Sequence, residues 1–231
     1  MVRTIVAICF AALALAAPGA HAEPELARGE PSESVAGPPA KGPGEFDFYV
    51  LSLSWSPGFC ESVEAGRSRP QCAPGAGNGF VVHGLWPQYE RGFPSDCDGP
   101  TAPSRLALAH AEGLFPDEGL ARHEWRKHGR CSGKSPSDYF AAVRRARESV
   151  TIPAPFQRPT EAQIFAPVDI QRAFIAANPR LRPGMLAVTC RKGVLAEVRI
   201  CLSRDLREFR ACPDVARQAC RAGEITAPAP L

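Results

Sequence analysis

The sequence predicts an α+β fold, a single disulfide-stapled domain in which several helices pack on a mainly antiparallel central sheet. Segments with strand character lie towards both ends of the chain, and segments with helical character lie between them. An exported chain of this sequence would also keep an even number of cysteines, which favours a fold held by disulfides. With 231 residues, the chain is long enough to bury a sizeable core.

The N-terminal residues 1–22 have the pattern of a secretory signal peptide. Arg3 is their only charged residue, residues 5–17 are apolar, and Ala20-His21-Ala22 fits the A-x-A cleavage rule. The apolar run is too short to span a bilayer. We therefore expect cleavage after Ala22 and a periplasmic or secreted protein that keeps no membrane segment.

The rest of the chain divides into three parts by composition. Residues 23–44 are rich in Pro, Gly, Ala, Glu and Ser, which predicts a flexible leader. Residues 45–222 have the size of one domain, and residues 223–231, which end in an Ala-Pro repeat, are expected to form a disordered tail. Removal of Arg3 lowers the formal net charge from +3 to +2. Such a mild charge means that any nucleic-acid binding must come from a local cluster.

Four segments have the apolar, aromatic and β-branched composition of strands. The first stops at Pro57-Gly58, and the last two flank Arg191-Lys192-Gly193, which predicts a hairpin. These segments are residues 46–55, 79–85, 185–190 and 194–201.

Four further segments are predicted to be helices. One of them has Ser135 as a cap, Pro136 at its first position and Asp138 in its first turn, and another ends at Asn178-Pro179. These segments are residues 104–113, 120–127, 139–149 and 168–177. We expect Arg144, Arg145 and Arg147 on the third to form a solvated face, and His110 to be a surface or helix-packing residue.

The cysteine count also fits an oxidising compartment. Nine cysteines are present, and Cys9 leaves with the signal, so eight remain. An even number predicts four disulfides, although spacing alone cannot fix their pairing. No C-x-x-C pair occurs, which argues against a zinc ribbon or a thioredoxin-type site.

Residues 123–131 carry several groups suited to acid–base chemistry. On a helix with His123 at 0°, the side chains of Lys127, Glu124 and His128 fall at about 40°, 100° and 140°. These four side chains are expected to face one cleft, whereas Trp125, at about 200°, is expected to anchor the core. Taken alone, the segment could also be a solvated helix end with hydrogen-bonded histidines.

A zinc protease site is the metal-dependent alternative for this segment. The motif H-E-x-x-H places two histidines four residues apart on one helix face. Here His123 and His128 are five residues apart, Lys127 would repel a metal ion, and no third ligand is evident. We therefore expect no metal and no cofactor.

A second segment, residues 80–87, places His83 in an otherwise apolar strand. A lone histidine there is usually a hydrogen-bonded core residue, and a lone Trp86 is usually a packing residue. Gly84 permits close backbone approach, and Trp86-Pro87 then turns the chain. The two segments together supply what metal-free cleavage of an RNA backbone needs: a general base, a general acid and donors for the phosphorus centre.

These two segments closely resemble the paired active-site signatures of the ribonuclease T2 family. The matches are HGLWP at residues 83–87 and HEWRKHG at residues 123–129, both unbroken. The resemblance extends over residues 46–222. It includes YVLSLSWSPGFC at residues 49–60, which is similar to bacterial periplasmic members, the stretch from Ala173-Phe174 to Asn178-Pro179, and EVRICL at residues 197–202.

The resemblance implies a secreted, metal-independent endoribonuclease. It implies that His128 is the general base, His83 the general acid, and His123 a phosphate contact, with Glu124 and Lys127 stabilising the phosphorus centre. RNA would be cleaved by transesterification to a 2′,3′-cyclic phosphate and then hydrolysed to a 3′-phosphate. The implied partner is single-stranded RNA, and we expect a monomer.

The resemblance also implies a base contact and a disulfide pattern. Trp86 would stack a base, but Gln88 and Tyr89 follow Pro87, where some members carry an acidic residue that reads the base edge. Gln88 is then the candidate second base contact, and broad base specificity is expected. The implied pairs are Cys60–Cys72, Cys97–Cys131, Cys190–Cys220 and Cys201–Cys212.

A family fold used without catalysis, as an RNA-binding or signalling protein, is the main alternative. The five polar residues His83, His123, Glu124, Lys127 and His128 are all present, so nothing in the sequence argues that catalysis was lost. Whether a ribonuclease of this kind serves scavenging or acts as an exported toxin is not decided by the sequence.

Overall fold

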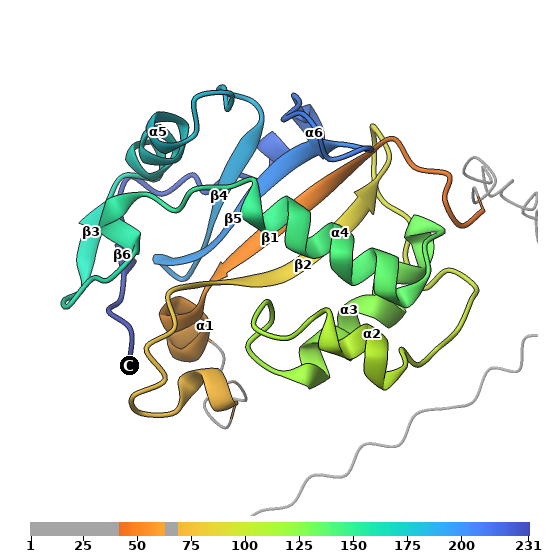
Figure 1. The fold of residues 1–231 in the computed structure, drawn as a ribbon. Helices are drawn as coiled ribbons and strands as arrows, with labels where there is room; N and C mark the ends of the chain where they lie inside the picture. Colours follow the sequence, from red (N-terminus) through yellow and green to blue (C-terminus); the bar gives the residue numbers. More distant parts are fainter. Residues whose placement is uncertain (1–41, 63–68) are drawn as a thin grey trace, which may run out of the picture. The chain divides into compact units, whose positions relative to one another are not determined.

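The computed structural model describes residues 42–62 and 69–231, which belong to a compact unit spanning residues 39–231. The predicted signal and nearly all of the predicted leader lie outside the described residues. A central sheet runs through this unit, and α4 crosses in front of it (Figure 1). The predicted α+β class is confirmed.

The sheet has six strands in the order β2-β1-β5-β6-β3, with β4 paired to β5. All pairings are antiparallel except the single parallel contact between β5 and β6. Four strands correspond to predicted segments, and two short strands, β3 and β6, were not predicted. The bounds are β1 Phe48–Trp55, β2 Phe80–Gln88, β3 Gln163–Phe165, β4 Leu186–Arg191, β5 Val194–Ser203 and β6 Ile225–Ala227.

Four of the described helices, α2 to α5, correspond to predicted segments, whereas α1 and α6 were not predicted. Ser135 accepts a hydrogen bond from the Asp138 backbone N–H, so the predicted cap of α4 is formed. The second helix, α2, is shorter than predicted, and α1 begins directly where strand β1 stops. The bounds are α1 Ser56–Ser62, α2 Arg105–Ala109, α3 Glu118–Lys127, α4 Pro136–Glu148, α5 Pro167–Ala177 and α6 Pro213–Ala216, with short 3₁₀ helices at Pro70–Cys72, Gly129–Ser132 and Ala154–Phe156.

The two faces of the sheet bury different clusters because side chains alternate along each strand. Tyr49, Leu51 and Leu53 of β1 lie in the large core together with Phe140 and Val143 of α4. The opposite face of the same strand contributes to a smaller cluster, against which Trp86 packs; its members include Phe48, Val50, Ala187, Cys201 and Val215. The helix α4 therefore covers one face, and Trp86 lies on the other.

The C-terminal segment is a correction to the predicted disordered tail of residues 223–231. Ile225 and Ala227 are buried in the large core, and strand β6 pairs with β3. Trp55 Nε1 donates a hydrogen bond of 3.0 Å to the carbonyl of Pro228, and Gly77 N–H donates one of 2.9 Å to the carbonyl of Leu231. The Ala-Pro composition misled the prediction because the apolar Ile225 and Ala227 just before it enter the core, and the carbonyl of Pro228 still accepts a hydrogen bond although proline has no N–H to donate.

Four disulfides connect the described chain in the pairing that the family resemblance implied. They are Cys60–Cys72, Cys97–Cys131, Cys190–Cys220 and Cys201–Cys212. The Cys97–Cys131 bond joins the loop after β2 to the turn after α3, and so braces the two segments that carry the predicted site. Among the described residues, no helix is long and apolar enough to cross a membrane.

Candidate active site

His83 occupies an irregular position in β2. Ser52 of β1 pairs with Gly84 and Leu53 pairs with Val82, so His83 is the extra residue of a β-bulge. Bulges change the direction of a side chain and are frequent beside active sites. Here the neighbours Val82 and Leu85 enter the large core, while the imidazole of His83 remains 37% exposed.

Two carboxylates flank the imidazole of His83. Its Nδ1 lies 2.5 Å from Glu197 Oε1, and its Nε2 lies 3.7 Å from Glu124 Oε1. Burial acts to lower the pKa of His83, but the hydrogen bond and charge of Glu197 and the charge of Glu124 together raise it above its usual value. His83 therefore keeps its protonated, proton-donating form to a higher pH than a free imidazole does.

His128 has the opposite preference. It follows the last residue of α3, where its backbone leaves the helical region (φ −126°, ψ −40°). The Nδ1 atom is buried without a hydrogen-bond partner. Burial, followed by the positive charges of His83 and Lys127, lowers the pKa of His128 to about 4, so this imidazole is neutral and can accept a proton above that pH.

The ring of Trp86 lies close to both histidines. Its ring centroid is 5.2 Å from that of His83 and 5.4 Å from that of His128. Its Nε1 donates a hydrogen bond of 2.7 Å to Glu124 Oε2, and the Arg199 guanidinium lies over the ring at 5.3 Å. Trp86 is thus part of the site, in contact with His83, His128, Glu124 and Arg199.

Glu124 is the buried carboxylate of this site. Only 2% of its side chain is exposed. Burial raises the pKa of Glu124 to about 7, against the opposing effects of the His83 charge and the Trp86 hydrogen bond. Glu124 therefore holds a proton through the acidic range.

Of the four side chains predicted to face one cleft, only His123 lines the cleft that also contains His83; Glu124, Lys127 and His128 do not line it. His123 is exposed, with a pKa lowered by burial and by Arg126. Lys127 turns towards the loop after β2, where its Nζ donates a hydrogen bond to Asp96. The helix ends at Lys127, so the regular angular spacing does not extend to His128. Trp125, as predicted, is a core residue, at 1% exposed.

The cleft beside His83 has a volume of about 970 Å³. It extends from His83 and His123 towards the β4–β5 strands and the 3₁₀ helix at Pro70–Cys72. Its charged lining residues include Arg69, Asp117, Arg126, Arg191, Glu197 and Arg199. An excess of guanidinium groups suits an anionic chain.

Gln88 does not line this cleft. Its side chain is buried, and its Nε2 donates a hydrogen bond of 3.0 Å to the carbonyl of Pro87. The suggested base contact of Gln88 therefore has no support from its position. Within residues 42–62 and 69–231, no group of three or more His, Cys, Asp or Glu side chains is arranged to hold a metal ion.

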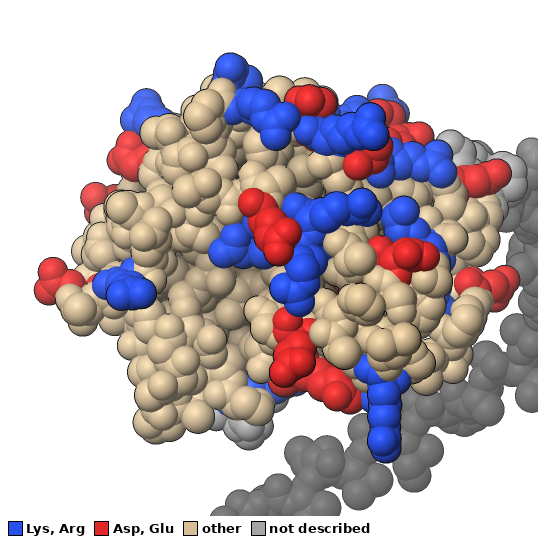
Figure 2. Space-filling model, in the orientation of Figure 1, with Lys and Arg blue, Asp and Glu red and all other residues tan. Residues whose placement is uncertain are grey.

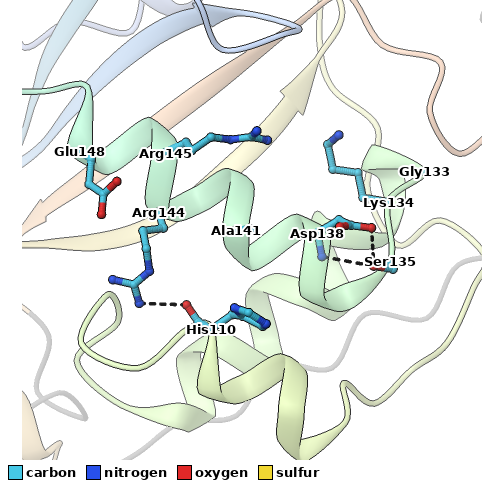
Figure 3. Close-up of a pocket in the computed structure, with 9 residues that line it drawn as sticks. All are labelled: His110, Gly133, Lys134, Ser135, Asp138, Ala141, Arg144, Arg145 and Glu148. Atoms are coloured by element: carbon cyan, nitrogen blue, oxygen red, sulfur yellow. Dashed lines mark hydrogen bonds between the residues drawn. The ribbon is translucent and has the colours of Figure 1, made fainter.

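A second cavity, of about 600 Å³, lies along α4 and is separate from this site. Figure 2 shows Lys and Arg side chains gathered on the face that α4 covers, with acidic side chains between them. In the close-up, Arg144 reaches the backbone of His110 (Figure 3). Arg144 also donates to the carbonyl of Glu112, and Arg147 donates to that of Val150. Two of the three α4 arginines thus stabilise loops, instead of only forming the solvated face that was predicted.

Three residues of the site were not predicted from the sequence: Glu197 and Arg199 of β5, and Asp96. Arg199 Nη2 lies 2.7 Å from Glu197 Oε2, and Glu197 binds His83 as described. A signal for the first two existed in EVRICL, where charged and apolar residues alternate along a strand. Such alternation predicts two faces, but it does not reveal that the polar face meets His83.

This chain is similar to known proteins in sequence. A model of the ribonuclease T2 family matches residues 46–212. A ribonuclease from Aeromonas hydrophila is 41% identical over 179 residues, which cover 74% of this chain and 78% of that protein.

Two solved structures have the same fold. They are an RNase-related protein from Calystegia sepium (23% identity, TM-score 0.63, 81% of this chain and 99% of that one) and a variant of RNase MC1 in complex with 5′-UMP (21% identity, TM-score 0.62, 78% and 98%). The extent of the family match and the 41% identity to the Aeromonas protein show that this chain belongs to the ribonuclease T2 family.

Proposed function

We propose that this chain is a secreted, metal-independent endoribonuclease that cleaves single-stranded RNA by transesterification, with broad base specificity. The observation that carries the proposal is the opposite protonation preference of two histidines whose rings both lie close to that of Trp86. His83 has a raised pKa, and His128 has a pKa of about 4. Between these values one imidazole is charged and the other neutral, which is the combination that acid–base cleavage needs.

The chemistry assigns one proton transfer to each histidine. Neutral His128 takes the proton of the ribose 2′-hydroxyl, and the 2′-oxygen forms a bond to phosphorus. Charged His83 gives its proton to the departing 5′-oxygen as the P–O5′ bond breaks. The products are a 2′,3′-cyclic phosphate and a free 5′-hydroxyl, and water then opens the cyclic phosphate to a 3′-phosphate by the reverse proton transfers.

The remaining predicted residues stabilise the charge that develops on the phosphorus oxygens. His123 lines the cleft beside His83 and contacts the phosphate. Glu124, with a pKa of about 7, donates a hydrogen bond in its protonated form. Lys127 adds positive charge close to the site, in spite of its hydrogen bond to Asp96. Trp86 is the proposed base contact. DNA is refused because it lacks the attacking hydroxyl.

The experiment is cleavage of single-stranded RNA by the mature, oxidised protein in excess EDTA, with the product ends identified by mass. Cyclic phosphate ends that persist in EDTA are expected. Loss of cleavage on chelation would instead support a metalloenzyme, and no cleavage between pH 4 and 8 by a folded protein would contradict catalysis. N-terminal sequencing of the exported protein tests cleavage after Ala22, and light scattering tests the expected monomer.

A further inference from the structure

Glu197 is a buried carboxylate whose two oxygens are both engaged. Its Oε1 lies 2.5 Å from His83 Nδ1, and its Oε2 lies 2.7 Å and 2.8 Å from Nη2 and Nε of Arg199. Arg199 is held in turn by a hydrogen bond of 2.5 Å to Gln218 and by the ring of Trp86. The result is a fixed chain of polar contacts from Gln218 to His83.

We infer that Glu197 is the positioning residue of the general acid: it holds His83 so that Nδ1 keeps a proton and Nε2 delivers one to the leaving group. The inference rests on the proposed function for the role of His83 as an acid, and it adds residues that the family resemblance did not assign. Glu197 itself acts through His83 and makes no transfer of its own.

The geometry determines which nitrogen of His83 does the chemistry. The hydrogen bonds from His83 and Arg199 keep Glu197 ionised, with a pKa of about 2, although burial opposes this. An ionised carboxylate can only accept hydrogen bonds, so the hydrogen between it and His83 belongs to Nδ1. The mobile proton of the imidazolium is then on Nε2, which points towards Glu124.

Glu124 cannot replace Glu197 as the counterion. Its oxygen is 3.7 Å from Nε2, and its pKa of about 7 leaves it mostly protonated in the acidic range. Glu197 is therefore the negative charge that stays beside His83 at every working pH. The charged or titratable groups that interact with His83 are Glu197 and Arg199 of β5, Glu124 and His123 of α3, and His128, which follows α3. Among them, Glu197 is the one that binds Nδ1.

The main test is Glu197→Gln, with Glu197→Asp as the conservative variant. Glutamine keeps the shape but removes the charge. We expect the His83 ionisation, followed by NMR, to move down by about one pH unit, a tenfold change in proton affinity. The neutral imidazole of the native protein should also be the Nδ1–H form. Glu197→Asp should recover part of the shift. The NMR readout does not depend on catalysis.

The kinetic test uses two substrates with different leaving groups. With a dinucleotide, whose 5′-alkoxide needs a proton, Glu197→Gln should lower kcat/KM at neutral pH by roughly 10- to 100-fold, as for other partners that orient a histidine. With a nucleoside 3′-aryl phosphate, whose phenolate leaves without a proton, the loss should disappear. Normal activity on the aryl substrate also shows that the variant is folded.

A matched control is Glu208→Gln, which removes an exposed carboxylate paired with Arg180 at 3.4 Å. This variant should leave the NMR titration of His83 and the activity on both substrates unchanged. An equal loss on the two substrates, or an unmoved His83 titration in Glu197→Gln, would overturn the inference. If the native protein cleaves neither substrate, the proposed function fails, while the NMR result still decides whether Glu197 positions His83.

Discussion

Trp86 Nε1 donates a hydrogen bond of 2.7 Å to Glu124 Oε2. The donor belongs to β2 and the acceptor to α3, so the bond joins two signatures that are 38 residues apart in the chain. The contact is possible because Gly84, between them, has no side chain. A Cβ atom at Gly84 would lie 2.1 Å from Glu124 Oε2 and 2.3 Å from Trp86 Nε1.

This close approach predicts that Gly84→Ala impairs the site. The added methyl group must push Glu124 and Trp86 apart, which costs roughly 1–3 kcal/mol of stability and lowers kcat by disturbing both residues. Thermal unfolding and kcat measure the two effects. Gly223→Ala is the control, since a Cβ there meets nothing within 4 Å. Equal melting temperatures and equal kcat values for the two variants would contradict a close approach of Glu124 and Trp86 over Gly84.

The pH dependence of kcat/KM should be bell-shaped. Activity requires neutral His128, so it should rise as pH increases through the His128 pKa of about 4. It also requires protonated His83 and benefits from protonated Glu124, whose pKa is about 7, so it should fall from about pH 7 upwards. Initial rates from pH 3 to 9 on a dinucleotide check this. A profile that rises continuously through pH 9 would contradict the assignment of the acid.

Replacement of either proton-transferring histidine should abolish most of the rate. His128→Ala and His83→Ala should each lower kcat by about 10²- to 10⁴-fold, because each removes one proton transfer. His110→Ala, in the separate cavity along α4, should have native activity. On a substrate with an aryl leaving group, the His83→Ala variant should recover activity, and the His128→Ala variant should not. Near-native activity in folded His128→Ala protein would refute its role as base.

Lys127→Ala should lower kcat more than it raises KM, because the proposed charge of Lys127 acts on the transition state. The exposed pair with Asp96 contributes little to stability, so the melting temperature should hardly change. Lys134→Ala, at the α4 cavity, is the matched control. A raised KM with an unchanged kcat would indicate that Lys127 acts in substrate binding and not on the transition state.

The C-terminal strand should be necessary for stability. Ile225 is 1% exposed, and Ile225→Ala should cost about 2–5 kcal/mol in urea unfolding of the oxidised protein. Ile164, on the neighbouring strand β3, is 67% exposed, and Ile164→Ala should change stability by about 0.5 kcal/mol or less. A small effect at Ile225 would restore the original expectation of a disordered tail.

The sequence by itself determined the class of fold, the main strands and helices, and the residues of the two signatures. These features depend on local patterns: alternation in strands, helical periodicity, the Ser135 cap, and motifs contiguous in the chain. Resemblance to the family also implied the disulfide pairs. Neither the local pattern nor the resemblance revealed β6, because the three residues Ile225–Ala227 form a strand only where β3 and β5 provide backbone partners.

Only the tertiary structure decided which carboxylate binds His83. Glu197 is 114 residues away in sequence, and it meets the imidazole because β1 pairs with β2 on one side and with β5 on the other. The β-bulge at His83 and the end of α3 before His128 then set the directions of the two imidazoles. Their opposite pKa shifts follow from burial and from neighbouring charges, which depend on distances in space that no local pattern in the sequence encodes.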